Sequence, residues 1–412
     1  MNVEGVMFVE ESRREAPAPS FIAQWSGFLY AARVMTVLLA VRLFGMEAET
    51  GVAISLVASF GLFLIALLTA RSEAIITLTE LRATPPGRAV LLYLVVTGTS
   101  LIWTVAASKA AAMAFWLAMV CDVAIVGLQL RQHSARGVVD AVFRGFVYGT
   151  VFVAVIAWLL PAQSDMRLGD EELLGPNQIG WPCALAFFFA QYLLRHQTQS
   201  RWKVCLVLFG VTLLRSLSKT TIVAFVLAQG YLLLVNSGLT RKAKVKILCL
   251  CMATLLLFTP LLISYFTSYA DSTSAESLTG RLGIWTYMLA EAVERPWFGH
   301  GFHSVWKVIP PFYSSGFQAR HAHNELLQQF YAYGAVGIAM MVAIYATIVR
   351  SVRSMRDVAT RQIFAGLFLL TLIRGFADTE AFDLSWPLWL LVLLGGLLLQ
   401  QMKTKEVIRC EL

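Results

Sequence analysis

The chain has 412 residues, of which 58% are hydrophobic and only 14% are charged, and its mean hydropathy is +0.68. This composition excludes a soluble globular protein, because a water-exposed fold could not bury so much apolar surface. The net charge of +8 could indicate a nucleic-acid partner, but the basic residues lie in short groups between apolar segments, as in cytoplasmic membrane loops. We therefore expect a membrane protein that contacts membrane lipid and no nucleic acid.

Apolar segments long enough to cross a bilayer recur along the whole chain. We expect spans near residues 22–43, 51–70, 88–107, 110–130, 138–160, 177–194, 202–215, 219–236, 246–266, 326–349, 362–376 and 385–402. The sequence therefore predicts an all-α polytopic membrane protein with about twelve transmembrane helices.

Basic residues predict how these spans are oriented. With a cytoplasmic N-terminus, most of the 33 lysines and arginines fall in cytoplasmic segments. The first residues include acidic side chains and no apolar run, so we expect no cleavable signal peptide. The resulting division is a cytoplasmic tail at 1–21, nine spans in 22–266, a large periplasmic loop at 267–325 between the ninth and tenth spans, three spans in 326–402 and a second cytoplasmic tail at 403–412.

Charged and thiol side chains within the spans are few. Arg33 lies midway along the first span, where a cation is a candidate for lining a substrate path. Arg42 lies on the opposite face of the same helix and cannot share a site with it. Cys249 and Cys251 would also point to different faces of a helix, so we expect no metal site there.

Two short segments place polar groups at the external ends of spans. In GPNQIG, Pro176 and Asn177 open a helix whose free backbone amides could favour an anion, or they simply mark a helix start. In LLRSLSKTT, a continuous helix would put Arg215 and Lys219 on one face. Two neighbouring cations near the apolar phase call for an anionic partner, although both could instead reach lipid phosphates.

The segment 267–325 is rich in aromatic residues, which predicts a folded cap on the membrane surface. Within it, apolar residues recur at helical spacing between Thr279 and Glu294, and Pro296 ends the pattern. The expected apolar face of this interfacial helix consists of Leu282, Trp285, Met288, Leu289, Ala292 and Val293.

Four of the six histidines also lie in this segment: His300, His303, His321 and His323. Any one of them could simply keep a periplasmic loop hydrated, but their clustering favours a site. A further polar group, Arg374 with Asp378 and Glu380, precedes the last predicted span. Mutual pairing within a short loop would account for this second group.

Read together, several motifs resemble those of a known family. In chain order they are SLSKTT, TGRLGIW, RPWFGHGFHSVW, HAHNELLQQFYAYGAVG and DTEAF. At these spacings, residues 170–385 are similar to the O-antigen ligase family, which also contains many O-antigen and exopolysaccharide polymerases.

This resemblance implies a metal-independent inverting glycosyltransferase that needs no cofactor and acts at the periplasmic face of the bacterial inner membrane. The implied donor is a glycan on undecaprenyl diphosphate, and the diphosphate-binding positions of the family fall on Lys219 and Arg281, with Arg215 as a further candidate. The family histidine falls on His323. Lysine in place of the arginine of many relatives keeps the charge but loses bidentate binding of phosphate.

The chemistry assigns further roles. His323, with His321 as the alternative, is the candidate base that takes the proton of the attacking sugar hydroxyl. The candidate residues along the substrate path are Asn177, Trp285 and Asn324. The S-K-T and D-T-E sequences resemble those of exopolysaccharide polymerases more than those of lipopolysaccharide ligases, and this resemblance implies another glycan as the acceptor. Transfer to lipid A-core by an O-antigen ligase is the alternative, and a lipid-linked oligosaccharide flippase is the alternative from another class.

Overall fold

The computed structural model describes residues 20–70, 81–161, 167–170, 173–197, 199–235, 240–246, 249, 278–310, 319–379 and 390–399. Regular structure in these residues is helical, apart from one isolated bridge between Asp170 and Leu174. Six of the described helices are long and apolar enough to cross a membrane. The chain is therefore an all-α polytopic membrane protein, as the composition predicted.

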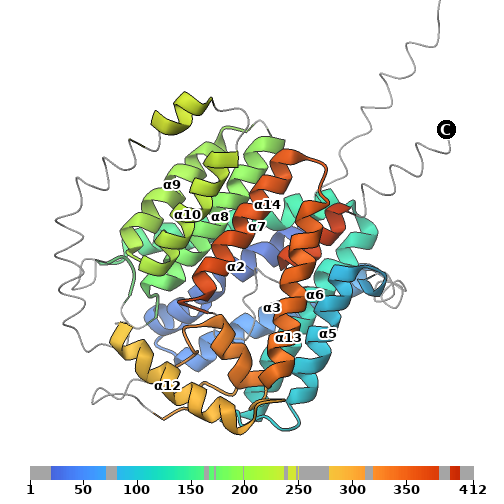
Figure 1. Ribbon diagram of the computed structural model, residues 1–412, viewed down its shortest axis with the longest axis vertical. Helices are drawn as coiled ribbons and strands as arrows, with labels where there is room; N and C mark the ends of the chain where they lie inside the picture. The colour runs from blue at the N-terminus through green and yellow to red at the C-terminus, as the bar shows by residue number, and fades with distance from the viewer. Residues whose placement is uncertain are drawn as a thin grey trace, which may run out of the picture.

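The described helices largely coincide with the predicted spans (Figure 1). They are α2 (Phe21–Phe44), α3 (Ala48–Ala70), α5 (Pro85–Ser100), α6 (Lys109–Gln132), α7 (Ala135–Leu159), α8 (Pro176–His196), α9 (Arg201–Ser216), α10 (Lys219–Val235), α12 (Leu278–Glu294), α13 (Glu325–Arg353) and α14 (Val358–Gly375). A short apolar helix, Leu390–Leu399, falls within the last predicted span. The predicted span 246–266 lies outside the described residues apart from Lys246 and Cys249.

Small residues bring α2 and α7 into close contact. A Cβ atom added to Gly145 would lie 1.8 Å from the carbonyl oxygen of Gln24, and one added to Gly27 would lie 2.1 Å from that of Val142. Glycines at such positions let the two backbones approach, as in other membrane helix pairs. From this pair, contacts continue through α3 to α6 and through α8 to α9, while α10 packs on α14 and α5 on α13.

An ion pair joins α2 to α6 within this bundle. Arg33 donates to the carboxylate of Asp122 at 3.0 Å, and its guanidinium lies 4.5 Å from the centroid of the Tyr30 ring. The Asp122 side chain is largely buried, whereas that of Arg33 is 32% exposed. Pairing with Asp122 explains how a membrane span tolerates this cation. The suggestion that Arg33 lines a substrate path stays a prediction.

The predicted interfacial helix is present as α12, but its apolar face differs from the prediction. Three side chains, spaced four residues apart, pack into a small separate core with Tyr331: Ile284, Met288 and Ala292. Three others lie on a different side of the helix and are at least half exposed: Leu282, Leu289 and Val293. The cap therefore has its own core, and α12 has a second apolar side that the described part of the chain leaves exposed.

Backbone hydrogen bonds attach the segment after α12 to the rest of the molecule. His300 and Gly301 donate to the carbonyls of Tyr331 and Ala332 on α13, and Val105 donates to the carbonyl of His300. Gly301 adopts a positive φ of 92°, and a Cβ atom there would lie 2.6 Å from Thr104. Only glycine combines this conformation with so close an approach, so the turn is set by the residue type.

His300 and His303 belong to this packing. The His300 ring stacks on Tyr331 at 4.5 Å, and the His303 ring stacks on Phe115 at 5.1 Å. Burial lowers the pKa of His303 to about 4 and also lowers the pKa of His300, so both rings are neutral at neutral pH. Their contacts agree with a structural role.

We expect the α2–α7 contact to govern stability. Gly145→Ala should destabilise the protein by about 1–3 kcal/mol or more, because the added methyl group meets a backbone carbonyl that cannot rotate away. Thermal unfolding of the purified protein in detergent measures the change. Gly61→Ala on α3 is the matched control, since a Cβ atom there meets nothing within 4 Å. Equal melting temperatures for the two variants would contradict this view of the packing.

Candidate functional site

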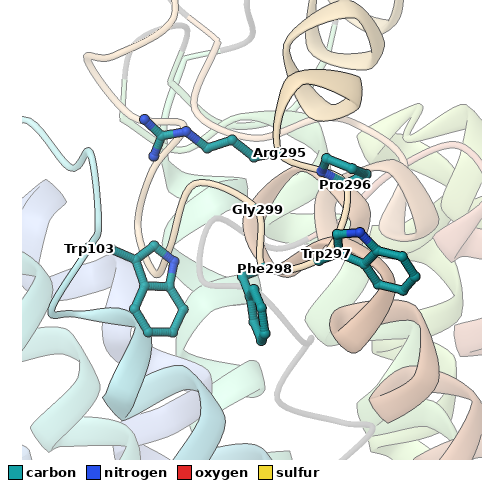
Figure 2. Close-up of a pocket in the computed structure, with 6 residues that line it drawn as sticks. All are labelled: Trp103, Arg295, Pro296, Trp297, Phe298 and Gly299. Carbon is teal, nitrogen blue, oxygen red and sulfur yellow. The ribbon is translucent and has the colours of Figure 1, made fainter.

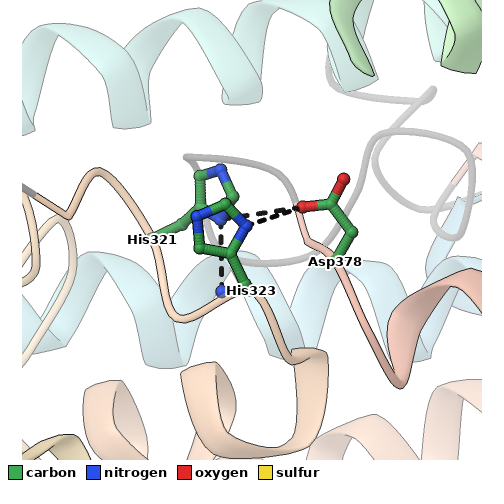
Figure 3. A group of neighbouring side chains, drawn as sticks. All are labelled: His321, His323 and Asp378. Atoms are coloured by element: carbon green, nitrogen blue, oxygen red, sulfur yellow. Dashed lines mark hydrogen bonds and ion pairs between the residues drawn. The ribbon is translucent and has the colours of Figure 1, made fainter. Parts of the chain in front are cut away.

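Two histidines and one aspartate lie together beside the N-terminus of α13 (Figure 3). Nδ1 of His323 lies 3.2 Å from Oδ1 of Asp378, and Nδ1 of His321 lies 3.9 Å from the same oxygen. The centroids of the two histidine rings are 4.1 Å apart. The structure thus brings together the two predicted base candidates and adds a carboxylate from the segment that follows α14.

Local backbone geometry fixes the direction of His323. Its φ is +51°, a left-handed conformation that histidine adopts more readily than most residues other than glycine. The next residue, Asn324, caps α13 by accepting a hydrogen bond from Leu327 N at 3.0 Å, and its amide donates to Phe376 O at 3.0 Å. Asn324 was predicted on the substrate path. Both ends of its side chain hold the turn that carries His323, and its place on the substrate path stays a prediction.

Trp285 supports the same segment from α12. Its indole N–H donates to the carbonyl oxygen of Ala322, between the two histidines, at 2.8 Å. The amide N–H of Ala322 in turn donates to the side chain of Gln328 at 2.8 Å. Trp285, also predicted on the substrate path, thus connects α12 to the histidine segment.

Asp378 is the most enclosed charged group of the site. Its side chain is 1% exposed; Arg374 donates to Oδ2 at 2.9 Å, and the backbone N–H of Thr379 donates to Oδ1 at 3.0 Å. Burial alone would raise the pKa of Asp378, but Arg374, His323 and His321 together hold that pKa well below its usual range. Asp378 is therefore a carboxylate across the physiological pH range.

The hydrogen-bond partners of the two histidine rings determine their tautomers. Because the Asp378 carboxylate can only accept, Nδ1 of His323 must carry the proton of their hydrogen bond, so Nε2 is the nitrogen that could accept a proton. The backbone N–H of His323 donates to Nδ1 of His321 at 3.3 Å, so the proton of His321 lies on Nε2. The pKa of His321 lies well below its usual range, chiefly because of burial. The charges of His323, Arg374 and Arg281 lower it further, and the Asp378 carboxylate only partly opposes them.

Arg374 and Glu325 attach this cluster to the helices. The Arg374 guanidinium, on the last turn of α14, lies 4.2 Å from the centroid of the Trp181 ring on α8. Glu325, buried at the start of α13, accepts hydrogen bonds from Thr379 and from Gln329. These contacts fix the segment that carries Asp378 between three helices.

Sequence reasoning did not assign Asp378 a role at the histidines. The expected pairing of Arg374 with Asp378 is present at the i, i+4 spacing, but the same carboxylate also reaches His323. Two features of the sequence could have identified the role of Asp378: the D-T-E motif and the i, i+4 spacing of Arg374 and Asp378. Glu380, the third member of that group, lies outside the described residues.

Among the predicted cations, Arg281 is hydrogen-bonded to the segment that carries Asp378. It occupies the first turn of α12 and donates from Nη1 to the carbonyl oxygen of Ala377, the residue before Asp378. Its buried Nε has no acceptor among the residues that the structure describes. The charge of Arg281 is also among the causes that lower the pKa of His321, so its field reaches the histidines.

Lys219 and Arg215 do not lie on one continuous helix, which corrects the sequence argument for their shared face. α9 ends at Ser216, Leu217 adopts a left-handed φ of 54°, and α10 begins at Lys219. The i, i+4 relation therefore does not hold. The turn places Lys219 in the first turn of α10 and Arg215 in the last turn of α9.

Asn177 holds this turn against α8. The hydroxyl of Ser218, directly before Lys219, donates to Oδ1 of Asn177 at 2.6 Å. Gly180 allows the close approach, since a Cβ atom there would lie 2.8 Å from that of Ser218. Trp181, the ring beneath Arg374, follows Asn177 by four residues on the same helix. The first turn of α8 thus links the Lys219 turn to the histidine and aspartate cluster.

The same cluster contains a possible metal-ligand set. The ligand atoms of His321, His323 and Asp378 all lie within 4.8 Å of one another, and these groups suit a transition metal. Arg374 already bonds the carboxylate, however, and both Arg374 and Arg281 place positive charge at the histidines. These charges favour an anion over a dication at this position.

Comparison with known proteins matches the part of the chain that contains the predicted cations and histidines. The family model described as O-antigen ligase matches residues 204–342. The matched residues are therefore similar to the O-antigen ligase family. It is also similar to the O-antigen ligase of Pseudomonas aeruginosa PAO1, with 29% identity over 143 residues, or 35% of this chain. The matched segment covers 32% of that relative.

The matched range 204–342 contains Lys219, Arg281, His321 and His323. Arg374, in the last turn of α14, and Asp378, in the segment after α14, lie beyond this matched range. The two parts are joined in the folded chain by hydrogen bonds, among them the one between His323 and Asp378.

Asp378→Asn tests the importance of the buried charge. The change keeps the shape of the side chain but leaves Arg374, 5% exposed, without its carboxylate, so we expect a loss of about 3 kcal/mol or more of stability. Thermal unfolding in detergent measures it. Glu49→Gln is the matched control, because it removes an exposed ion pair with Lys307 and should cost less than about 1 kcal/mol. Similar losses in both variants would count against a special role for Asp378.

Proposed function

We propose that this protein is a metal-independent, inverting glycosyltransferase that moves a glycan from undecaprenyl diphosphate to an acceptor hydroxyl at the periplasmic face of the bacterial inner membrane. The observation that supports the proposal is the hydrogen bond between the ionised Asp378 and His323, which lies within the range matched by the O-antigen ligase family model, beside Arg281. A histidine oriented by a carboxylate, next to fixed cations, suits transfer from a diphosphate leaving group.

His323 acts as the general base. With its proton on Nδ1 and donated to Asp378, its Nε2 accepts the proton of the acceptor hydroxyl as that oxygen bonds to the anomeric carbon. The Asp378 carboxylate then stabilises the imidazolium that forms, as the aspartate does in a Ser-His-Asp triad. The low pKa of Asp378 keeps it ionised throughout. His321, neutral and partly buried, accepts from the backbone of His323 and positions that residue.

The leaving group needs positive charge. As the bond between the anomeric carbon and the phosphate oxygen breaks, negative charge accumulates on the diphosphate, which departs as undecaprenyl diphosphate. Lys219 and Arg281 stabilise this charge, with Arg215 at the outer side of the same turn. Attack by the hydroxyl on the face opposite the leaving group inverts the anomeric centre. Fixed cations thereby take the place that a divalent metal occupies in other transferases.

This activity requires the topology predicted from the basic residues. Twelve spans with both termini in the cytoplasm place the segment 267–325 in the periplasm between the ninth and tenth spans. The site then lies at the external ends of α8, α10, α13 and α14, where a lipid diphosphate from the outer leaflet can reach Lys219. The membrane holds the polyprenyl chain, and the cap covers the reacting groups.

We infer that the acceptor is another lipid-linked glycan, as in an exopolysaccharide polymerase, because of the S-K-T and D-T-E sequences. The second candidate is transfer to lipid A-core. The observation that favours it is the similarity to the Pseudomonas aeruginosa protein named O-antigen ligase.

Purified protein given an undecaprenyl-diphosphate repeat unit and a chelator should make longer lipid-linked chains, which gel electrophoresis of labelled glycan detects. Conjugation only after lipid A-core is added would favour the ligase over the polymerase. If neither product forms, yet vesicles containing the protein move the lipid-linked sugar across the bilayer, the transferase proposal fails. Product that appears only with a divalent metal would overturn the metal-independent mechanism.

Single substitutions test the residue roles in the same assay. His323→Ala should lower the rate about 10²–10⁴-fold through loss of the base, and Lys219→Ala or Arg281→Ala about 10²–10³-fold through loss of leaving-group stabilisation. Lys219→Arg should remain active if the role of Lys219 is to supply positive charge to the diphosphate. Lys307→Ala, which removes an exposed cation of the same cap, should behave as wild type. Wild-type rates from His323→Ala would remove the base assignment.

A further inference from the structure

A second feature of the cap lies at the opposite end of α12 from Arg281. A pocket of about 490 Å³ opens where the segment after α12 meets the segment between α5 and α6 (Figure 2). Its lining consists of Trp103, Arg295, Pro296, Trp297, Phe298 and Gly299. The Trp103 and Phe298 rings meet edge to face at 6.2 Å, so aromatic carbon forms most of the wall, and Arg295 supplies its one charge.

The geometry of α13 places this pocket at the membrane surface. α13 has 29 residues and is about 43 Å long, whereas the hydrocarbon core is about 30 Å thick. Gly334, with a non-helical φ of 60°, divides it, and the part after Gly334 is about 28 Å long and fits that core. The carbonyls of Pro296 and Trp297 accept hydrogen bonds from Ala335 and Val336, directly after this division. The pocket therefore lies at the depth where polar headgroups meet acyl chains.

The protein surface around the pocket is apolar. Trp297 and Phe298 are 69% and 63% exposed, and Ile102, beside Trp103, is 80% exposed. Val293, one turn earlier on α12, continues this surface toward Leu289. A contiguous exposed apolar surface marks a contact with a partner or a membrane, and tryptophan beside arginine is typical of the membrane interface.

We propose that this pocket binds an anionic phospholipid, with an acyl chain against Trp103, Trp297 and Phe298 and the phosphate on Arg295. An acyl chain matches the apolar wall, and the guanidinium supplies the donors that a phosphate oxygen requires. A saccharide, the other ligand that aromatic rings could bind, needs several polar partners, and the wall offers few. The proposal does not depend on the transfer reaction.

Bound lipid would hold the cap at the bilayer. The turn that forms the pocket is hydrogen-bonded to α13 at its division, and α12 runs from this turn to Arg281. A lipid in the pocket thus attaches one end of α12 to the membrane while the other end contributes to the candidate site. The pocket is an anchoring site and takes no part in the chemistry.

Photocrosslinking in the full-length protein tests the proposal. Phe298 is replaced by p-benzoylphenylalanine, and the protein is reconstituted in vesicles of phosphatidylglycerol or of phosphatidylcholine and irradiated. We expect phospholipid adducts by mass spectrometry, with a yield about fivefold higher in phosphatidylglycerol, the factor that corresponds to about 1 kcal/mol for one basic residue at an anionic surface. The same probe at Glu294, on the polar side of α12, is the control and should give few adducts.

Arg295 determines the preference for the anionic lipid. In the Phe298 probe background, Arg295→Ala should abolish the fivefold preference, and Arg295→Lys should retain most of it. Equal yields from the probes at Phe298 and Glu294 would indicate general contact with the bilayer and overturn a defined site. Adducts with added lipid-linked glycan in place of phospholipid would overturn the choice of ligand. An unchanged preference for phosphatidylglycerol in Arg295→Ala would contradict the proposed binding of the phosphate by Arg295.

Discussion

The buried carboxylate of Asp378 is the group on which the arrangement of the site depends. A negative charge so enclosed is tolerated only with close partners, and here the partners are Arg374, His323 and a backbone amide. Arg374 lies on α14 and His323 directly precedes the cap of α13, so the need to pair this charge fixes the ends of these two helices relative to one another. Arg374 extends the connection to α8 through the Trp181 ring. A single electrostatic requirement thus sets the direction of the histidine ring that we propose as the base.

The polar residues next to the proposed reacting groups are largely committed to holding short turns. Asn324 caps α13, Trp285 donates to the histidine segment and Asn177 accepts from Ser218. In each case one hydrogen bond attaches a turn that carries a proposed reacting group to a neighbouring helix. This division between positioning and reacting residues is what an electrostatic mechanism requires, because cations and base must be held before charge develops.

Continuous apolar segments were enough to predict the described bundle helices, since a membrane span must be continuous, apolar and internally hydrogen-bonded. The local sequence pattern was insufficient wherever a tertiary contact determined where a helix ends, which side of it is buried or which side chains meet. The left-handed Leu217 ends α9 before Lys219, although propensity alone would continue the helix. α12 buries Ile284 and leaves Leu289 exposed because the cap core meets only one of its apolar sides. Asp378 reaches His323 across 55 positions of the chain, and no local pattern in one sequence reveals such a pair.

The structure of the protein with bound undecaprenyl diphosphate, determined by electron cryomicroscopy in a nanodisc, would test the proposed site most directly. We expect the diphosphate within ion-pair distance of Lys219 and Arg281, with Nε2 of His323 facing the position of the anomeric carbon. The hydrogen bond between His323 and Asp378 should be retained. A diphosphate bound away from both cations, or a metal ion coordinated by His321, His323 and Asp378, would contradict the proposed mechanism.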